Sequence, residues 1–134
     1  MVRPLAVLTA VMVAIANVPV AVAEAPTKPE LIPMERLGEF VCTAYCGCRK
    51  CNGKWYGCPT ASGTDCVEGR TVAVDPDVIP LGTELYIEGY GWFVAEDTGN
   101  GIDGNRLDMY YDDHGVALEH GVKRVEVWVK EGAI

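Results

Sequence analysis

The chain has 134 residues, of which 49% are hydrophobic and 22% are charged, a length typical of a single domain. It carries 19 acidic and 11 basic residues, so its formal net charge is −8. This balance argues against a nucleic-acid-binding protein, which would present a basic surface to phosphates, and against attachment to an anionic membrane surface.

Residues 1–23 have the layout of a secretory signal peptide. Arg3 precedes a largely apolar run, and the small residues of Ala21–Ala23 are typical of a cleavage site. An uncleaved membrane anchor is the alternative, because the apolar run is just long enough to cross a bilayer. We expect cleavage after Ala23, which would release residues 24–134 without stable membrane insertion.

Residues 24–38 contain three prolines and little periodicity, so we expect a linker or N-terminal arm before a domain at 39–134. In that domain, short alternating or apolar runs are separated by Gly, Pro and Asp, a pattern that predicts β-strands. The candidate strands are Phe40–Tyr45, Arg70–Val74, Glu84–Ile87, Trp92–Glu96, Arg106–Tyr110 and Arg124–Val129.

One short helix is predicted at His114–His120. Asp113 is suited to cap its start, and Gly121 is suited to end it in a left-handed conformation. Six short strands, one short helix and many turns predict a mainly β fold in the form of a small barrel.

All six cysteines lie between Cys42 and Cys66. In an exported chain an even number of cysteines favours disulfides, in pairings that the sequence leaves open. Zinc is the alternative, because Cys48-x-x-Cys51 has ligand spacing and Cys46 or Cys58 would complete a four-thiolate set. Either cross-link would stabilise a glycine-rich segment with little apolar area of its own.

A catalytic thiol is disfavoured, because no histidine lies near the cysteines in the sequence. His114 and His120 fall on different faces of the predicted helix, so a metal shared between them is not expected. We therefore assign no metal and no cofactor.

Three aspartates stand in apolar or glycine-rich surroundings. Asp75 before a proline and Asp97 before Thr98-Gly99 are each typical of turns. Asp108 lies inside a strand pattern, where aspartate is disfavoured. If it is buried, its pKa would be raised and it would be a candidate general acid. Together the three indicate a site.

Six motifs in a fixed order resemble the three-aspartate ("3D") domain of exported bacterial cell-wall enzymes, which include the stationary-phase survival muralytic proteins. The motifs are Thr43–Tyr45, Thr60–Thr64, Gly69–Pro76, Ile79–Gly82, Glu96–Gly99 and Gly104–Asp108. The resemblance covers about residues 39–130, and the barrel of this family is similar to that of membrane-bound lytic transglycosylase A. The chain departs from the family pattern in its cysteine cluster and at Asn100–Asp103.

The resemblance implies a six-stranded double-psi β-barrel that cleaves peptidoglycan between N-acetylmuramic acid and N-acetylglucosamine. One carboxylic acid protonates the glycosidic oxygen, then takes the proton of the muramyl C6 hydroxyl as this attacks C1, which yields a 1,6-anhydro product. By match to the motif, Asp108 would be the acid and base. Asp97 would raise the pKa of Asp108 or stabilise an oxocarbenium-like charge, and Asp75 would orient the site.

Substrate contacts are expected from hydroxyls, from glycines that allow close backbone approach, from aromatic rings that stack on sugars, and from a cation. These residues are Thr60, Ser62, Thr64, Gly99, Gly101, Trp55, Tyr56 and Arg106.

The preferred function is that of a secreted, cell-wall-associated lytic transglycosylase, a monomer whose partner is the glycan strand of peptidoglycan. A hydrolytic muramidase with the same site and a non-catalytic peptidoglycan-binding barrel are the alternatives, and a small disulfide-rich effector is a third. The presence of all three aspartates favours an enzyme, because function depends on the site and not on the fold.

Overall fold

The computed structural model describes residues 32–134. The predicted signal peptide at 1–23 and the first part of the predicted arm lie outside this range. Within it, no helix combines the length and the hydrophobicity that a membrane crossing requires.

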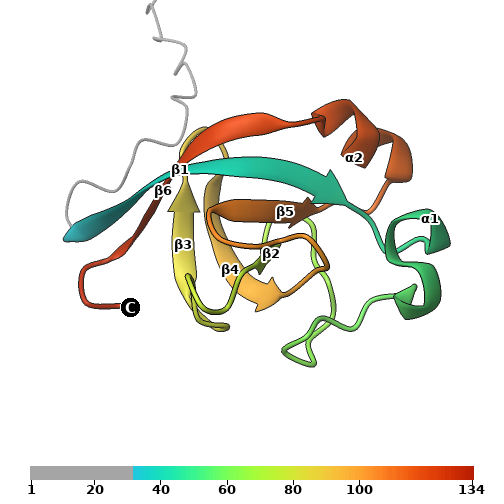
Figure 1. The fold of residues 1–134 in the computed structure, drawn as a ribbon, viewed down its shortest axis with the longest axis horizontal. Coiled ribbons are helices and arrows are strands. Elements are labelled where there is room, and N and C mark those ends of the chain that lie inside the picture. The colour runs from blue at the N-terminus through green and yellow to red at the C-terminus, as the bar shows by residue number, and fades with distance from the viewer. Residues whose placement is uncertain (1–31) are drawn as a thin grey trace, which may run out of the picture.

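Six strands form the structure, and they agree with the six predicted ones to within a few residues except at the start of the first (Figure 1). They are β1 (Met34–Tyr45), β2 (Thr71–Val74), β3 (Glu84–Ile87), β4 (Gly91–Asp97), β5 (Arg106–Tyr110) and β6 (Lys123–Lys130). The predicted helix is confirmed as α2 (His114–His120), capped by the Asp113 side chain, which accepts a hydrogen bond from the Val116 amide. Two single-turn helices that were not predicted, α1 (Arg49–Asn52) and η1 (Gly53–Trp55), lie in the cysteine-rich segment.

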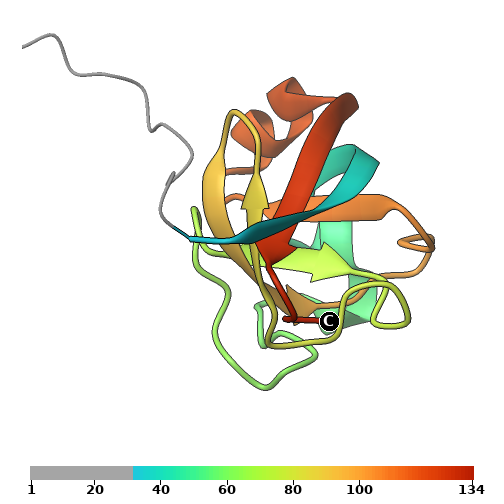
Figure 2. The ribbon, with the colours of Figure 1, turned by 90° about the vertical axis from the view of Figure 1, so that its left-hand side faces the viewer.

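The strands close into a barrel in the order β1-β5-β2-β4-β3-β6 (Figures 1 and 2). The pairs β1–β5 and β2–β4 are parallel, and the other four pairs are antiparallel. Exchanging β1, β2 and β3 with β4, β5 and β6 reproduces both this order and these directions. The barrel is therefore built from two interlocked three-stranded halves, and the predicted double-psi β-barrel is confirmed.

The core fills the inside of the barrel. Val125, Val127 and Val129 of β6 point inward, as their alternation predicts, and pack with residues such as Leu85 and Leu107 from the other strands. A second, smaller cluster lies on the outer face of the barrel. Its members are Tyr45, Ala73 and Tyr110, with Cys58 and Cys66 packed against them.

This outer cluster exists because the segment between β1 and β2, residues 46–70, folds back over the barrel. We call this segment the cysteine loop. It covers the outer face of β1, β5 and β2, so side chains on that face are shielded on one side by strands and on the other by the loop. A polar site between the two would be partly removed from water.

Strand β1 begins at Met34, inside the segment for which a linker or arm was predicted. Met34 pairs with Lys130 of β6, and the register shifts between Arg36 and Gly38. Gly38 has a φ of 114°, which a residue with a side chain rarely adopts. The last residues of the predicted arm therefore belong to the sheet and depend on this glycine.

We predict that Gly38→Ala lowers the free energy of unfolding by about 1–2 kcal/mol, because alanine is strained at this φ. Urea denaturation would measure the change. Glu35→Ala, at an exposed position of the same strand, serves as the control and should change stability by less than about 0.5 kcal/mol. Equal effects of the two substitutions would contradict the assigned role of Gly38.

Candidate functional site

A cleft of about 570 Å³ opens on the outer face of the barrel, beneath the cysteine loop. Strands contribute Tyr45, Ala73, Asp97 and Asp108 to its lining, and the short helices α1 and η1 and the loops contribute the remainder, which includes Trp55. Its volume falls within the range of about 300–1,000 Å³ that is usual for small-molecule sites.

Four side chains form one row across the sheet that underlies this cleft. Thr43 of β1 pairs with Asp108 of β5, Asp108 pairs with Ala73 of β2, and Ala73 pairs with Asp97 of β4. Residues that pair directly across strands project from the same face of a sheet. The two aspartates therefore flank the small side chain of Ala73 on the face that the cleft exposes.

A β-bulge in β4 brings Asp97 into this row. Val72 pairs with Ala95 and the next residue, Ala73, pairs with Asp97, so that Glu96 is the extra residue. A regular register would place Glu96 opposite Ala73. The bulge thus re-aims the strand so that the shorter aspartate occupies the row, as bulges near functional sites often do.

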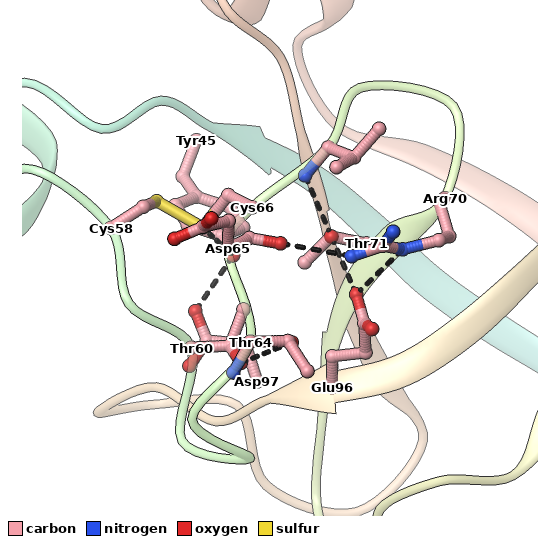
Figure 3. A network of polar contacts seen from close by, with 11 residues as sticks. Tyr45, Cys58, Thr60, Thr64, Asp65, Cys66, Arg70, Thr71, Glu96 and Asp97 are labelled. Atoms are coloured by element: carbon pink, nitrogen blue, oxygen red, sulfur yellow. Dashed lines mark hydrogen bonds and ion pairs between the residues drawn. A yellow bond between two sulfur atoms is a disulfide. The ribbon is translucent and has the colours of Figure 1, made fainter.

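Glu96 is buried and binds the neighbouring side chains of Thr71 and Arg70 (Figure 3). Its Oε2 accepts a hydrogen bond from the Thr71 hydroxyl at 2.7 Å and pairs with Arg70 Nε at 3.2 Å. Arg70 also donates to the carbonyl of Asp65 at 2.9 Å, which ties the end of the cysteine loop to β4.

Asp97 is held by three donors. Tyr45 Oη donates to Oδ2 at 2.7 Å, and the amides of Ala61 and Thr98 each donate to Oδ1 at 2.9 Å. Burial raises the pKa of Tyr45 and the hydrogen bond to Asp97 raises it further, so the phenol remains a donor. Both carboxylate oxygens of Asp97 are therefore occupied.

Asp108 is in a different environment. Its Oδ1 accepts a hydrogen bond from the Thr43 hydroxyl at 2.9 Å, and within residues 32–134 no donor lies at Oδ2. Burial raises the pKa of Asp108 above its ordinary value. The Thr43 hydrogen bond and then His120 oppose the rise, and the negative charge of Asp97 adds to it. Asp108 thus lines the cleft, has one oxygen without a donor among the described residues, and has a pKa that favours the protonated form.

Asp75 lies outside the cleft lining. Its carboxylate accepts hydrogen bonds from the amide of Asp77 at 2.9 Å and from the amide of Gly104 at 2.7 Å. These bonds lower the pKa of Asp75, with Gly104 as the larger cause. The side chain connects the turn after β2 to the loop that leads into β5, the strand that carries Asp108.

The expected substrate-contacting residues fall into two groups. Trp55, Thr60 and Gly99 line the cleft, and Trp55 is 75% exposed. The others are not part of the lining, namely Ser62, Thr64, Tyr56, Gly101 and Arg106.

Hydrogen bonds within the cysteine loop explain part of this division. The hydroxyls of Thr60 and Thr64 bond to each other at 2.8 Å, and the Ser62 amide donates to the carbonyl of Glu96 at 2.9 Å. A disulfide between Cys58 and Cys66 closes this stretch (Figure 3). The segment acts as a fixed wall that supplies the Ala61 amide to Asp97.

Sequence reasoning did not identify Thr43 and Tyr45 as partners of the two aspartates. Both lie in the same strand, two residues apart, and so share one face of it. The shared face of Thr43 and Tyr45 could be predicted from this alternation. Their partners could not, because they are 65 and 52 residues away in the chain.

The predicted disulfide framework is confirmed for one pair, Cys58–Cys66. Cys42 is buried in the barrel core as a free thiol. The three other cysteines, Cys46, Cys48 and Cys51, are also free thiols, and they lie close to His114. No histidine lies near the cysteines in the sequence, so this proximity of His114 was not predicted.

Residues 70–131 match the family model of the 3D domain. The match confirms the resemblance that the motifs indicate, over the part of the chain that carries Asp75, Asp97 and Asp108.

Two Bacillus subtilis (strain 168) proteins are similar in sequence. The cell wall-binding protein YocH is 45% identical over 73 residues, which are 52% of this chain and 25% of YocH. YabE, whose name refers to cell wall shaping, is 38% identical over 89 residues, which are 63% of this chain and 21% of YabE. The chain therefore spans a quarter or less of the length of these relatives.

Among solved structures, MltA from E. coli is similar with a TM-score of 0.47 and 27% identity. The likeness covers 54% of this chain and 27% of MltA.

The raised pKa of Asp108 predicts a specific dependence of stability on pH. A carboxyl whose pKa is raised by folding stabilises the protein while it is protonated, and this contribution is lost as the pH rises through the folded-state pKa. Relative to Asp108→Asn, the wild type should therefore lose free energy of unfolding as the pH rises from about 4, the ordinary value for aspartate. Urea titrations of both proteins at stepped pH would measure this, and parallel profiles would contradict it.

Proposed function

We propose that the protein is a peptidoglycan lytic transglycosylase, which cleaves the bond between N-acetylmuramic acid and N-acetylglucosamine and forms a 1,6-anhydromuramyl product. The observation that carries this proposal is the row in which Asp108 and Asp97 flank Ala73 at an open cleft. The match to the 3D domain and the cell-wall names of YocH and YabE support the wall as the substrate.

Asp108 acts as the acid and then as the base. Its raised pKa favours the protonated form and its side chain lines the cleft, so it donates a proton to the glycosidic oxygen as the bond to C1 breaks. The resulting carboxylate takes the proton of the muramyl C6 hydroxyl while that oxygen bonds to C1. No water is consumed, and Asp108 ends in its starting state.

Asp97 acts as the fixed negative charge. Three donors hold it in place, and a carboxylate so positioned stabilises the positive charge that develops at C1 and the ring oxygen. Two strand spacings, about 10 Å between Cα atoms, separate Asp97 from Asp108. Ala73, which lies between them, has a small side chain and lines the cleft, so in this proposal the reacting sugar lies over it.

The other predicted residues act around this pair. Trp55 stands exposed at the cleft and is suited to stack on a sugar ring, and Gly99 lets the backbone approach the glycan. Asp75 positions β5 through the Gly104 amide and does not touch the substrate. In this proposal the protein is exported and acts at the cell wall.

A non-catalytic wall-binding barrel is the second candidate. The name of YocH, a cell wall-binding protein, supports it, as does the exposed ring of Trp55. The raised pKa of a cleft carboxyl favours the enzyme instead, because binding alone does not require a protonated acid.

The first test is mass spectrometry of the soluble products after the protein is incubated with purified peptidoglycan. We expect muropeptides that end in 1,6-anhydromuramic acid, and we expect Asp108→Asn to reduce their rate of formation about 100-fold or more while the fold is kept. Asp77→Asn, a change at an exposed aspartate outside the cleft, should leave the rate unchanged.

The alternatives give different outcomes in the same experiment. Products with reducing ends would indicate hydrolysis and a carboxylate that activates water. No products, together with sedimentation of the protein with the wall material, would indicate a binding module. Wild-type turnover by Asp108→Asn would transfer the acid role to Asp97.

The role of Asp97 can be tested without changing its charge. Tyr45→Phe removes the hydroxyl that bonds to Oδ2, and we expect kcat to fall by about 10-fold or more while KM changes little. Tyr110→Phe is the matched control, since Tyr110 belongs to the same outer cluster but lies outside the cleft lining. Equal effects of both variants would indicate a packing role.

A further inference from the structure

A group of three thiols and one imidazole lies beside the cleft, apart from the aspartates. It consists of Cys46, Cys48, Cys51 and His114, and we call it the thiol–imidazole cluster. His114 Nδ1 lies 3.4 Å from Cys46 Sγ, 3.3 Å from Cys48 Sγ and 3.5 Å from Cys51 Sγ. All four ligand atoms lie within 4.8 Å of one another.

These separations are those of a tetrahedral metal site. Zinc bound at about 2.3 Å from sulfur and about 2.0 Å from nitrogen places its ligand atoms about 3.5–3.8 Å apart. Cys46 Sγ and Cys51 Sγ are 3.6 Å apart, and the three nitrogen–sulfur distances are similar. The side chains thus converge on one point at the distances that a central ion would impose.

We propose that this cluster binds one zinc ion through three thiolates and the Nδ1 atom of His114. Soft thiolates together with an imidazole in a tetrahedral set favour zinc over magnesium or calcium, which prefer oxygen ligands. Disulfides do not account for the whole cluster, because pairing two of its three thiols leaves one over. Cys58 and Cys66 are already joined, and the remaining free thiol, Cys42, is buried in the barrel core. The ion displaces the protons of the three thiols, and no oxidation or reduction takes place.

The local structure holds the ligands in position. Cys48 caps α1, and the Asn52 amide donates to its carbonyl at 3.0 Å. The Asn52 side chain donates to the carbonyl of Cys46 at 2.9 Å, which folds the three cysteines around one point. His114 is the first residue of α2, directly after the Asp113 cap, and Figure 1 shows α1 and α2 at the same end of the barrel.

The zinc ion would fasten the cysteine loop to the barrel next to the cleft. Cys51, Asn52 and Trp55 all line the cleft, so this ion would set the position of the cleft wall that carries the exposed tryptophan. The effect on glycan binding rests on the proposed function, but the metal site does not depend on it. Binding of zinc can therefore be tested without an activity assay.

The test is the metal content of the purified full-length protein, followed by replacement of the metal with cobalt. We expect about one zinc ion per chain and, for the cobalt form, the visible absorption of a tetrahedral site with thiolate ligands. Protein without zinc, in which two of the cluster thiols have formed a disulfide by peptide mapping, would overturn the proposal. Neither measurement requires a variant that might unfold.

Variants of His114 test whether this side chain is a zinc ligand or has only a structural role. His114→Ala should weaken zinc binding by about 10-fold or more in competition with a coloured chelator, because one of four ligands is lost. His114→Cys restores a four-ligand set and should retain zinc while it changes the cobalt spectrum. The same zinc affinity in His114→Ala and the wild type would exclude His114 as a ligand.

Trypsin provides a structural measurement that is independent of catalysis. Arg49, Lys50 and Lys54 are exposed in the loop that the zinc ion would close. With zinc bound these sites should resist cleavage, and a chelator should make them sensitive while the barrel stays intact. Unchanged cleavage after zinc removal would contradict the proposal that the metal holds this wall. If the zinc-bound protein released no products from peptidoglycan, that result would contradict the proposed function and not the zinc site.

Discussion

The register of the strands around β2 is the constraint on which the site depends. Ala73 pairs with Asp97 on one side and with Asp108 on the other, so two residues from separate strands share a single row. β2 belongs to one half of the barrel and β4 to the other, so their parallel pairing is part of the interlock between the halves. A shift of one residue in either pair would turn a carboxylate toward the core, because the side-chain period of a strand is two.

The same register explains why the two aspartates differ. Asp97 follows the bulge at the end of β4, where the amides of Ala61 and Thr98 and the Tyr45 hydroxyl reach it. Asp108 lies within β5, where the backbone groups are engaged in strand pairing and a single hydroxyl contacts its side chain. Their positions in the strands therefore leave Asp97 with hydrogen-bond donors at both carboxylate oxygens and Asp108 with a donor at one. Acid–base chemistry requires two carboxylates whose environments differ in this way.

The cysteine loop adds the cover that a barrel surface lacks. The disulfide between Cys58 and Cys66 holds the half of the loop that supports Asp97, and the thiol–imidazole cluster lies in the half that carries Trp55. The disulfide, and the zinc ion that we propose, would each cross-link a short segment that has little apolar area of its own. The cover that this loop provides explains why a position on the outside of a barrel is partly shielded from water, which raises the pKa of Asp108.

The sequence by itself determined the elements, the resemblance to the 3D domain and the candidate acids. Alternation in β6, the cap at Asp113 and the aspartate in a strand pattern are local signals, and each was sufficient for its prediction. Only the tertiary structure decided the register, the bulge at Glu96 and the partners of each carboxylate, because these arise from pairings between distant strands. His114 shows the limit most clearly, because 63 residues separate it from Cys51. The parallel pairing of β1 with β5 is what brings the segments that follow these strands together.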